Sequence, residues 1–188
     1  MIDQAVTFVA RRLDEALKAL YVVDEPLVAV APVADSEGKM PGAVRNKLAL
    51  FIANIADDQM PRPSRGGFGE VRRAPPVHLD VYIMLAAAFE PDAYGEGLKL
   101  LASAMRVFQA NPTFSQISAP DMPPGLGQLG IEIANLRNDE VGQLWGNLGG
   151  RYLPSVMYKL RSVPIDAAAV VEVPPLIRDP SQSAETTG

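Results

Sequence analysis

One stretch near the middle of the chain decides the fold class: Val77-His78-Leu79-Asp80-Val81-Tyr82-Ile83-Met84-Leu85. Apolar side chains at its odd-numbered positions alternate with His78, Asp80, Tyr82 and Met84. Because successive side chains of an extended chain point to opposite sides, this period of two predicts a long β-strand.

Two strands are expected before this one and two after it. Residues 27–33 alternate large and small apolar side chains, and residues 47–55 are apolar almost throughout, which indicates a strand covered on both faces. Because no helical pattern separates the first three strands, we expect hairpin-like, antiparallel pairing among them. Residues 129–133 and 156–161 predict the fourth and fifth strands. The fifth can continue to Ile165 if Pro164 lies at a sheet edge or a bulge.

Three helices are expected around these strands. Residues 2–20 carry apolar side chains at three- and four-residue steps, with Asp3 as a candidate N-cap and a supporting pair between Asp14 and Lys18. A second helix follows Asp92, its candidate cap, and ends before Pro112, which cannot continue the hydrogen-bond ladder. Its expected buried stripe consists of Tyr94, Leu98, Leu101, Met105 and Phe108.

The third helix is short, at about residues 139–148, with Asn138 or Asp139 as its cap. The Gly149-Gly150 pair that follows predicts its end, because glycine adopts positive φ without steric cost. Close by, Trp145 and Tyr152 supply large aromatic surfaces. We interpret Trp145, Gly149, Gly150 and Tyr152 as anchors of the fold rather than as contacts with a partner.

The order of elements defines the fold class. Helix, three strands, helix, strand, helix and strand describe an α+β fold, with a mixed, largely antiparallel sheet of about five strands packed by about three helices. At 188 residues, the chain is expected to form a single domain over residues 1–173. Residues 174–188 are rich in proline, serine and threonine without an apolar period, and we expect them to be disordered.

Composition excludes several classes of function. The chain has no cysteine and one histidine, which excludes a disulfide scaffold, a thiolate metal site and a multi-histidine metal centre. A net charge of −5 argues against a general nucleic-acid binder. The start of the chain lacks the pattern of a secretory signal, and its longest apolar run is far shorter than the roughly 20 residues of a membrane helix. We therefore expect a soluble protein that is made in the cytoplasm and does not insert into membranes.

The residues capable of catalysis do not form a convincing active site. His78 and Asp80 share one face of a strand, but the chain has no G-x-S-x-G nucleophile elbow. Asp80 and Glu132 could meet across the sheet as paired carboxylates, although solvated charges on a strand are the better interpretation. We expect no enzyme and no cofactor; a deep pocket gathering His78, Asp80 and Arg161 would revive the alternative.

Residues 57–76 form a long segment with prolines, glycines and four arginines: Arg62, Arg65, Arg72 and Arg73. The segment matches neither a P-loop nor a dinucleotide fingerprint, because a strand rather than a helix follows it. A flexible loop is the simplest interpretation. The functional hypothesis is that the four arginines contact an acidic surface on a partner, which predicts salt-sensitive attachment.

Several stretches together resemble one protein family. They are residues 1–8, the strand from Val77 into Phe89, the helix from Tyr94 to Phe108, Phe114, residues 129–136, and the run from Leu144-Trp145 through Gly149-Gly150-Arg151-Tyr152-Leu153-Pro154 to Lys159. In this order they resemble the cap, or tail-terminator, proteins of extracellular contractile injection systems of the antifeeding-prophage type. The likeness runs from residue 1 to about residue 166.

The resemblance implies a structural role. Such caps form a ring, typically a hexamer, on the baseplate-distal end of the inner tube, where they stop polymerisation and fasten the last sheath ring. The implied partners are further copies of the chain, the tube protein and the sheath protein, in an extracellular or cytoplasmic particle. The alternative is an adaptor that recruits a cargo or membrane partner through the arginine-rich segment.

Overall fold

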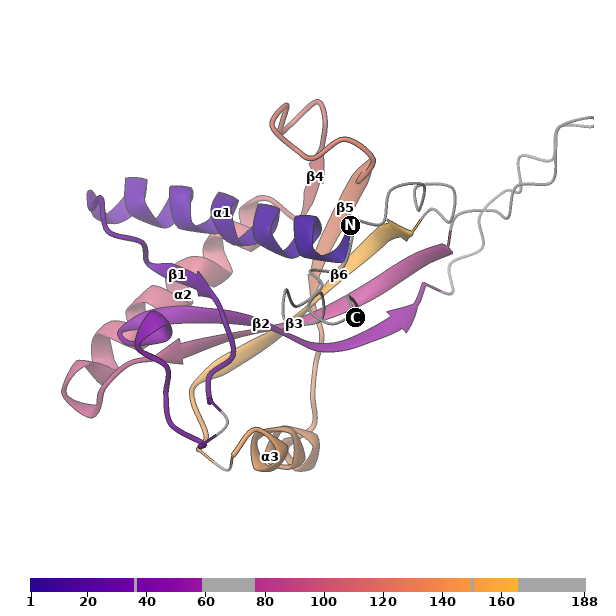
Figure 1. The fold of residues 1–188 in the computed structure, drawn as a ribbon. Coiled ribbons are helices and arrows are strands. Elements are labelled where there is room, and N and C mark those ends of the chain that lie inside the picture. The colour runs from indigo at the N-terminus through magenta and orange to yellow at the C-terminus, as the bar shows by residue number, and fades with distance from the viewer. Residues whose placement is uncertain (36, 59–76, 150, 166–188) are drawn as a thin grey trace, which may run out of the picture.

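The computed structural model describes residues 1–35, 37–58, 77–149 and 151–165. These residues form one sheet with helices on both of its faces (Figure 1). The elements are, in chain order, α1 (Ile2–Tyr21), β1 (Val28–Val30), the 3-10 helix η1 (Gly42–Val44), β2 (Lys47–Asp57), β3 (Val77–Ala88), the 3-10 helix η2 (Pro91–Ala93), α2 (Tyr94–Ala110), β4 (Thr113–Ser115), β5 (Gln128–Ile133), α3 (Asn138–Asn147) and β6 (Ser155–Ile165). The predicted α+β class is confirmed.

The sheet has the strand order β1-β2-β3-β6-β5-β4. The long strand predicted from residue 77 is β3, and it lies between β2 and β6, antiparallel to both. The expected antiparallel pairing of the first two strands is wrong, because β1 runs parallel to β2, with Val28 opposite Leu48. Residues 31–46, with η1 among them, carry the chain back along the sheet, so that β2 starts at the same end as β1.

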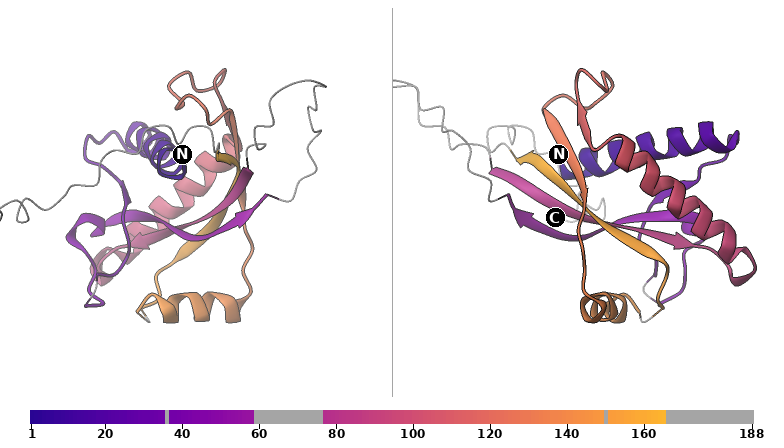
Figure 2. Two further views of the ribbon diagram at one scale, coloured as in Figure 1. Left: turned by 45° about the vertical axis from the view of Figure 1, so that its right-hand side comes forward. Right: turned by 180° about the vertical axis from the view of Figure 1, so that it is seen from behind.

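Helices cover both faces of the sheet, as the two further views in Figure 2 show. Alternate β3 side chains, including Val81, Ile83 and Leu85, pack in the main core under α1 and α2. Met84 and Ala86 point the other way, into a smaller core that contains Trp145 of α3. Burial on both faces explains why β3 ends in an almost wholly apolar run.

The helix caps differ from those predicted. The N-cap residues are Met1, Ala93 and Arg137, so Asp3, Asp92, Asn138 and Asp139 each lie inside a helix or a preceding turn. At α3, the carboxylate of Glu140 accepts a hydrogen bond from the Arg137 amide at 2.8 Å. That bond satisfies one of the free N–H groups at the helix start.

Asp14 joins the first helix to the sheet. Its carboxylate lies 3.9 Å from the Lys18 ammonium, as predicted, but it also accepts hydrogen bonds from the backbone amides of Leu27, at 2.7 Å, and Val28, at 3.0 Å. Because these amides begin β1, the Asp14 carboxylate fixes the position of the first strand against α1.

The predicted buried stripe of α2 is partly wrong. Leu101 and Phe108 are buried, but Tyr94, Leu98 and Met105 are 51%, 41% and 36% exposed. Gly97, Leu100, Ser103 and Ala104 take the buried positions instead. Small residues face inward because the helix lies so close to its neighbours that a Cβ on Gly97 would stand 2.8 Å from the Phe89 ring.

The strand count is also corrected. Residues 113–115 form a sixth strand, β4, within a segment expected to be an irregular connection. Pro164 pairs with His78 of β3, whereas the ladder between β6 and β5 ends at Arg161. Pro164 therefore lies where β6 has an open side among the described residues, as predicted for a proline in a strand. The boundary at residue 173 and the segment 174–188 lie outside the described residues.

Candidate interaction surfaces

A cluster of four charged residues lies on the sheet face that α3 covers, beyond the end of that helix. Asp80 comes from β3, Lys159 and Arg161 from β6, and Glu132 from β5. The Lys159 ammonium is 2.8 Å from the Glu132 carboxylate and 3.8 Å from the Asp80 carboxylate. The Arg161 guanidinium is 3.6 Å from Glu132. We call these residues the β3–β6–β5 charge cluster.

The two carboxyl groups of the cluster differ in environment. Asp80 is 8% exposed, and its Oδ1 has no hydrogen-bond partner. Burial raises the pKa of Asp80, against the attraction of Lys159. The hydrogen bond from Lys159 lowers the pKa of Glu132, and the same bond raises the pKa of Lys159. The ion pair with Lys159 therefore stabilises the charged form of Glu132, whereas burial destabilises the charged form of Asp80.

The four side chains pair with one another across three strands, an arrangement suited to holding the strands in place rather than to acid–base chemistry. Asp80 and Glu132 do approach each other, but the Lys159 ammonium lies between them and pairs with both. His78 is next to the cluster on β3 and pairs across the ladder with Pro164. Among the described residues, no group of three histidine or acidic side chains could hold a metal ion.

The end of the sheet that carries β2 and β3 beyond the helices, which we call the sheet tip, is the second surface. Side chains of Ile55 and Val77 are 44% and 52% exposed there, and Ile52, further back along β2 and opposite Ile83, is 42% exposed. β1 pairs only with Leu48–Leu50, so the outer edge of β2 has no strand partner past Leu50 among the described residues. The prediction that this strand is covered on both faces holds only for its first half. An open edge of this kind can accept another strand.

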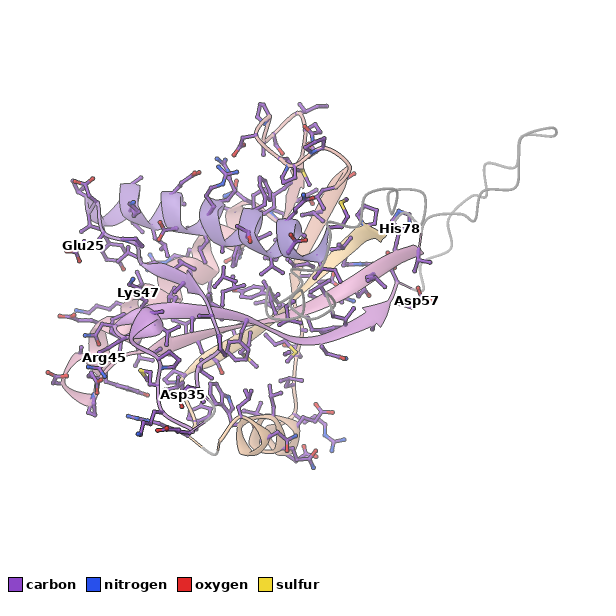
Figure 3. The ribbon with its side chains drawn as sticks, viewed as in Figure 1. Glu25, Asp35, Arg45, Lys47, Asp57 and His78 are labelled. Atoms are coloured by element: carbon purple, nitrogen blue, oxygen red, sulfur yellow. The ribbon has the colours of Figure 1, made fainter. Side chains whose placement is uncertain are left out.

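The four arginines proposed as contacts, Arg62, Arg65, Arg72 and Arg73, lie outside the described residues. The residues that flank their segment lie side by side, because the Asp58 amide donates a hydrogen bond to the His78 carbonyl oxygen at 2.9 Å. Figure 3 shows Asp57 and His78 together at the sheet tip, at the opposite end of the molecule from Glu25. The arginine-rich segment therefore leaves from the sheet tip and returns to it.

The aromatic pair near α3 has a buried and an exposed member. Trp145 is 3% exposed, and the ring of Tyr152 meets it edge-on at 5.8 Å, although Tyr152 is 61% exposed. Gly149 has φ of 101°, the left-handed region that favours glycine, and Gly150 lies outside the described residues. The role of these residues as fold anchors stays a prediction.

Comparison with known families decides the relationship of the chain. The family model described as the Pvc16 N-terminal domain matches residues 4–179. The chain belongs to the Pvc16 N-terminal domain family. The resemblance to contractile-injection caps seen in the sequence is thereby confirmed. No curated protein matches the chain.

Two solved structures are similar to this member of the Pvc16 N-terminal domain family. One is the sheath/tube terminator of the PVC extracellular contractile injection system in its extended state, with a TM-score of 0.54 at 15% identity over 96% of this chain and 65% of that chain. The other is the tube-terminating cap of the anti-feeding prophage, with a TM-score of 0.46 at 19% identity over 96% of this chain and 60% of that chain. The chain thus spans less than two thirds of each, and the first match shows that the fold is shared.

No helix among the described residues is both long enough and apolar enough to cross a bilayer.

Proposed function

We propose that the protein is a cap subunit that closes the end of the inner tube of a contractile injection particle and fastens the last sheath ring. Membership of the Pvc16 N-terminal domain family over residues 4–179 carries this proposal. The fold shared with a PVC sheath/tube terminator over 96% of the chain supports it. Its partners would be the tube protein, the sheath protein and further copies of the chain, most simply as a six-membered ring.

The surfaces of the molecule suit a terminator. Such a subunit must bind the last ring of a tube through one face and leave no equivalent surface for another ring to bind. The open edge of β2 and the exposed isoleucines of that strand, Ile52 and Ile55, are suited to a sheath or tube contact. A ring multiplies each contact by its number of subunits, so weak individual contacts are sufficient for stable attachment.

The proposed role requires no chemical step. The charge cluster pairs Lys159 with both of its carboxylates, and we expect this to fix the strands rather than to activate a substrate. The protein would be assembled in the cytoplasm as a component of an extracellular or cytoplasmic particle.

An adaptor is the second candidate. The arginine-rich segment starts and ends at the sheet tip, where it could recruit a cargo or membrane partner. Replacing Arg62, Arg65, Arg72 and Arg73 would then leave particle length unchanged while the partner is lost.

Deleting the gene and measuring the particles by electron microscopy tests the main proposal. We expect inner tubes of broadly variable length and sheaths that detach, both restored by the wild-type protein. Particles of normal, uniform length with stable sheaths would contradict the proposal.

A further inference from the structure

A groove of 330 Å³ lies at the end of the molecule opposite the sheet tip. It runs between the last turn of α1, the start of β1 and the first turns of α2. Its lining consists of Tyr21, Val23, Leu27, Asn46, Phe89, Ala93, Glu96, Lys99 and Leu100. We call it the α1–α2 groove. Most of its surface is apolar, and its volume has room for a large side chain.

Apolar side chains surround the groove without contributing to the core. Leu20, Val22 and Tyr94 are 59%, 90% and 51% exposed. Val22 also has φ of 54°, in the left-handed region where a β-branched residue is sterically strained. A strained, almost fully exposed valine does little for the stability of one subunit. A concentration of such residues at one end indicates a contact surface.

The charges around the groove are mainly acidic. The exposed carboxylates beside it are Asp24, Glu25, Asp92 and Glu96, and the ammonium groups are those of the half-buried Lys47 and the exposed Lys99. The other nearby cations are paired: Arg45 lies 3.4 Å from Glu90, and Lys18 lies 3.9 Å from Asp14. The four carboxylates and two ammonium groups leave a net charge of −2. A cationic partner is therefore favoured.

This chain contains a segment of the required character. Residues 59–76 hold four arginines and one acid, Glu70, a net charge of 4 − 1 = +3. They also hold one aromatic residue, Phe68, with glycine on either side. An aromatic side chain among arginines complements an apolar groove with an acidic rim.

The segment of the same subunit starts at the wrong end of the sheet to fill its own groove (Figure 3). Val77 and Ala88 are eleven residues apart on β3, which corresponds to about 36 Å, and the groove lies beyond Ala88, at Phe89. Phe68 is nine residues from Val77, a distance that an extended chain spans by at most about 32 Å. Even a fully extended chain thus brings Phe68 of the same subunit only to the margin of the groove, so another copy of the protein is the favoured donor of the segment.

We propose that the α1–α2 groove of one subunit binds residues 59–76 of a neighbouring subunit, with Phe68 in the groove and arginines against Glu25 and Glu96. The contact joins opposite ends of two subunits, which is the head-to-tail geometry that closes into a ring. The inference rests on the proposed cap function and specifies how its subunits associate. It also assigns the acidic surface expected for the arginines to a second copy of the chain rather than to a different protein.

Molar mass in solution, measured by light scattering over a range of protein concentrations, tests the contact. We expect the wild-type chain to form assemblies, and Phe68→Ser or a double Glu25→Arg, Glu96→Arg variant to be monomeric at concentrations at least tenfold higher. The matched control is Glu37→Arg, which reverses an exposed acid away from the groove and should leave association unchanged. A monomeric wild-type protein, or variants that associate normally, would overturn the inference.

Exchanging the charges gives a more specific test. The Arg65→Glu, Arg72→Glu variant and the Glu25→Arg, Glu96→Arg variant should each be monomeric alone but associate when mixed, because each then offers the other an opposite charge at both contacts. No association in the mixture would refute the pairing. If the arginine variant keeps its assemblies but no longer binds tube or sheath, this inference fails while the cap function stands.

Discussion

Replacing Gly97 with alanine tests how closely α2 packs against the end of β3. A Cβ at this position would lie 2.8 Å from Phe89 Cδ2, 2.9 Å from Cγ and 3.1 Å from Cβ. Turning the ring about its Cβ–Cγ bond moves only Cδ2 of these three atoms, so that rotation does not relieve the clash. Phe89 or the helix itself must move.

The magnitude follows from two opposing effects. Alanine in a helix is favoured over glycine by about 1 kcal/mol, whereas overpacking costs about 1–3 kcal/mol. We expect Gly97→Ala to lower the free energy of unfolding by up to about 2 kcal/mol on this balance. Gly95 is the matched control, because it lies in the same helix and a Cβ there meets nothing within 4 Å. Gly95→Ala should stabilise the protein by about 0.5–1 kcal/mol.

Urea unfolding followed by circular dichroism measures both variants on one scale. The predicted result is a gap of about 1–3 kcal/mol between them with unchanged m-values. Because Phe89 also lines the α1–α2 groove, Gly97→Ala should weaken self-association as well. Equal stability of the two variants would show that α2 does not approach Phe89 as closely as described.

Three further predictions concern single side chains. Trp145→Ala removes a buried ring and should cost about 3–5 kcal/mol in urea unfolding, while Tyr152→Ala, at an exposed position, should cost far less; equal losses would contradict the packing. The raised pKa of Asp80 means that the folded state binds more protons than the unfolded state just above pH 3.8, so the contribution of Asp80 to stability falls as the pH rises above 3.8. Asp80→Asn should remove this contribution from the pH dependence of the free energy of unfolding. Val22→Gly relieves strain of about 1–2 kcal/mol against an entropic cost of about 0.5–1 kcal/mol; calorimetry should show equal or higher thermal stability, and a clear loss would contradict it.

The regular parts of the fold could be predicted because their periods are long and unbroken. Twelve residues of β3 and twenty of α1 give enough repeats to identify a strand and a helix. The direction in which two strands pair cannot be predicted from such repeats. The parallel alignment of β1 with β2 depends on the path of residues 31–46, which carry no period of their own.

Hydrophobicity alone misplaced the inner face of α2. Tyr94, Leu98 and Met105 are the most apolar choices for a buried stripe, yet Gly97 and Ala104 are buried in their place. A close approach between elements selects small residues, and a single sequence does not show which elements approach closely. Of the exposed residues, Tyr94 forms part of the surface around the α1–α2 groove.

The candidate sites show the same limit. Asp80 and Glu132 could be suggested as neighbours, but their separation by Lys159 follows from the position of β6 between β3 and β5. The α1–α2 groove is assembled from three stretches of chain, at residues 21–27, 46 and 89–100, none of which carries a motif. The arginine-rich segment could be identified from composition, whereas the α1–α2 groove proposed to bind it exists only in the folded chain.

Locating the protein on purified inner tubes tests the cap proposal most directly. A tagged chain would be added to tubes, and the positions of the tag counted in electron micrographs at low and high salt. The account predicts label at one end of each tube, on the baseplate-distal side. Label distributed along the tube walls, or tubes that elongate normally without binding the protein, would contradict it.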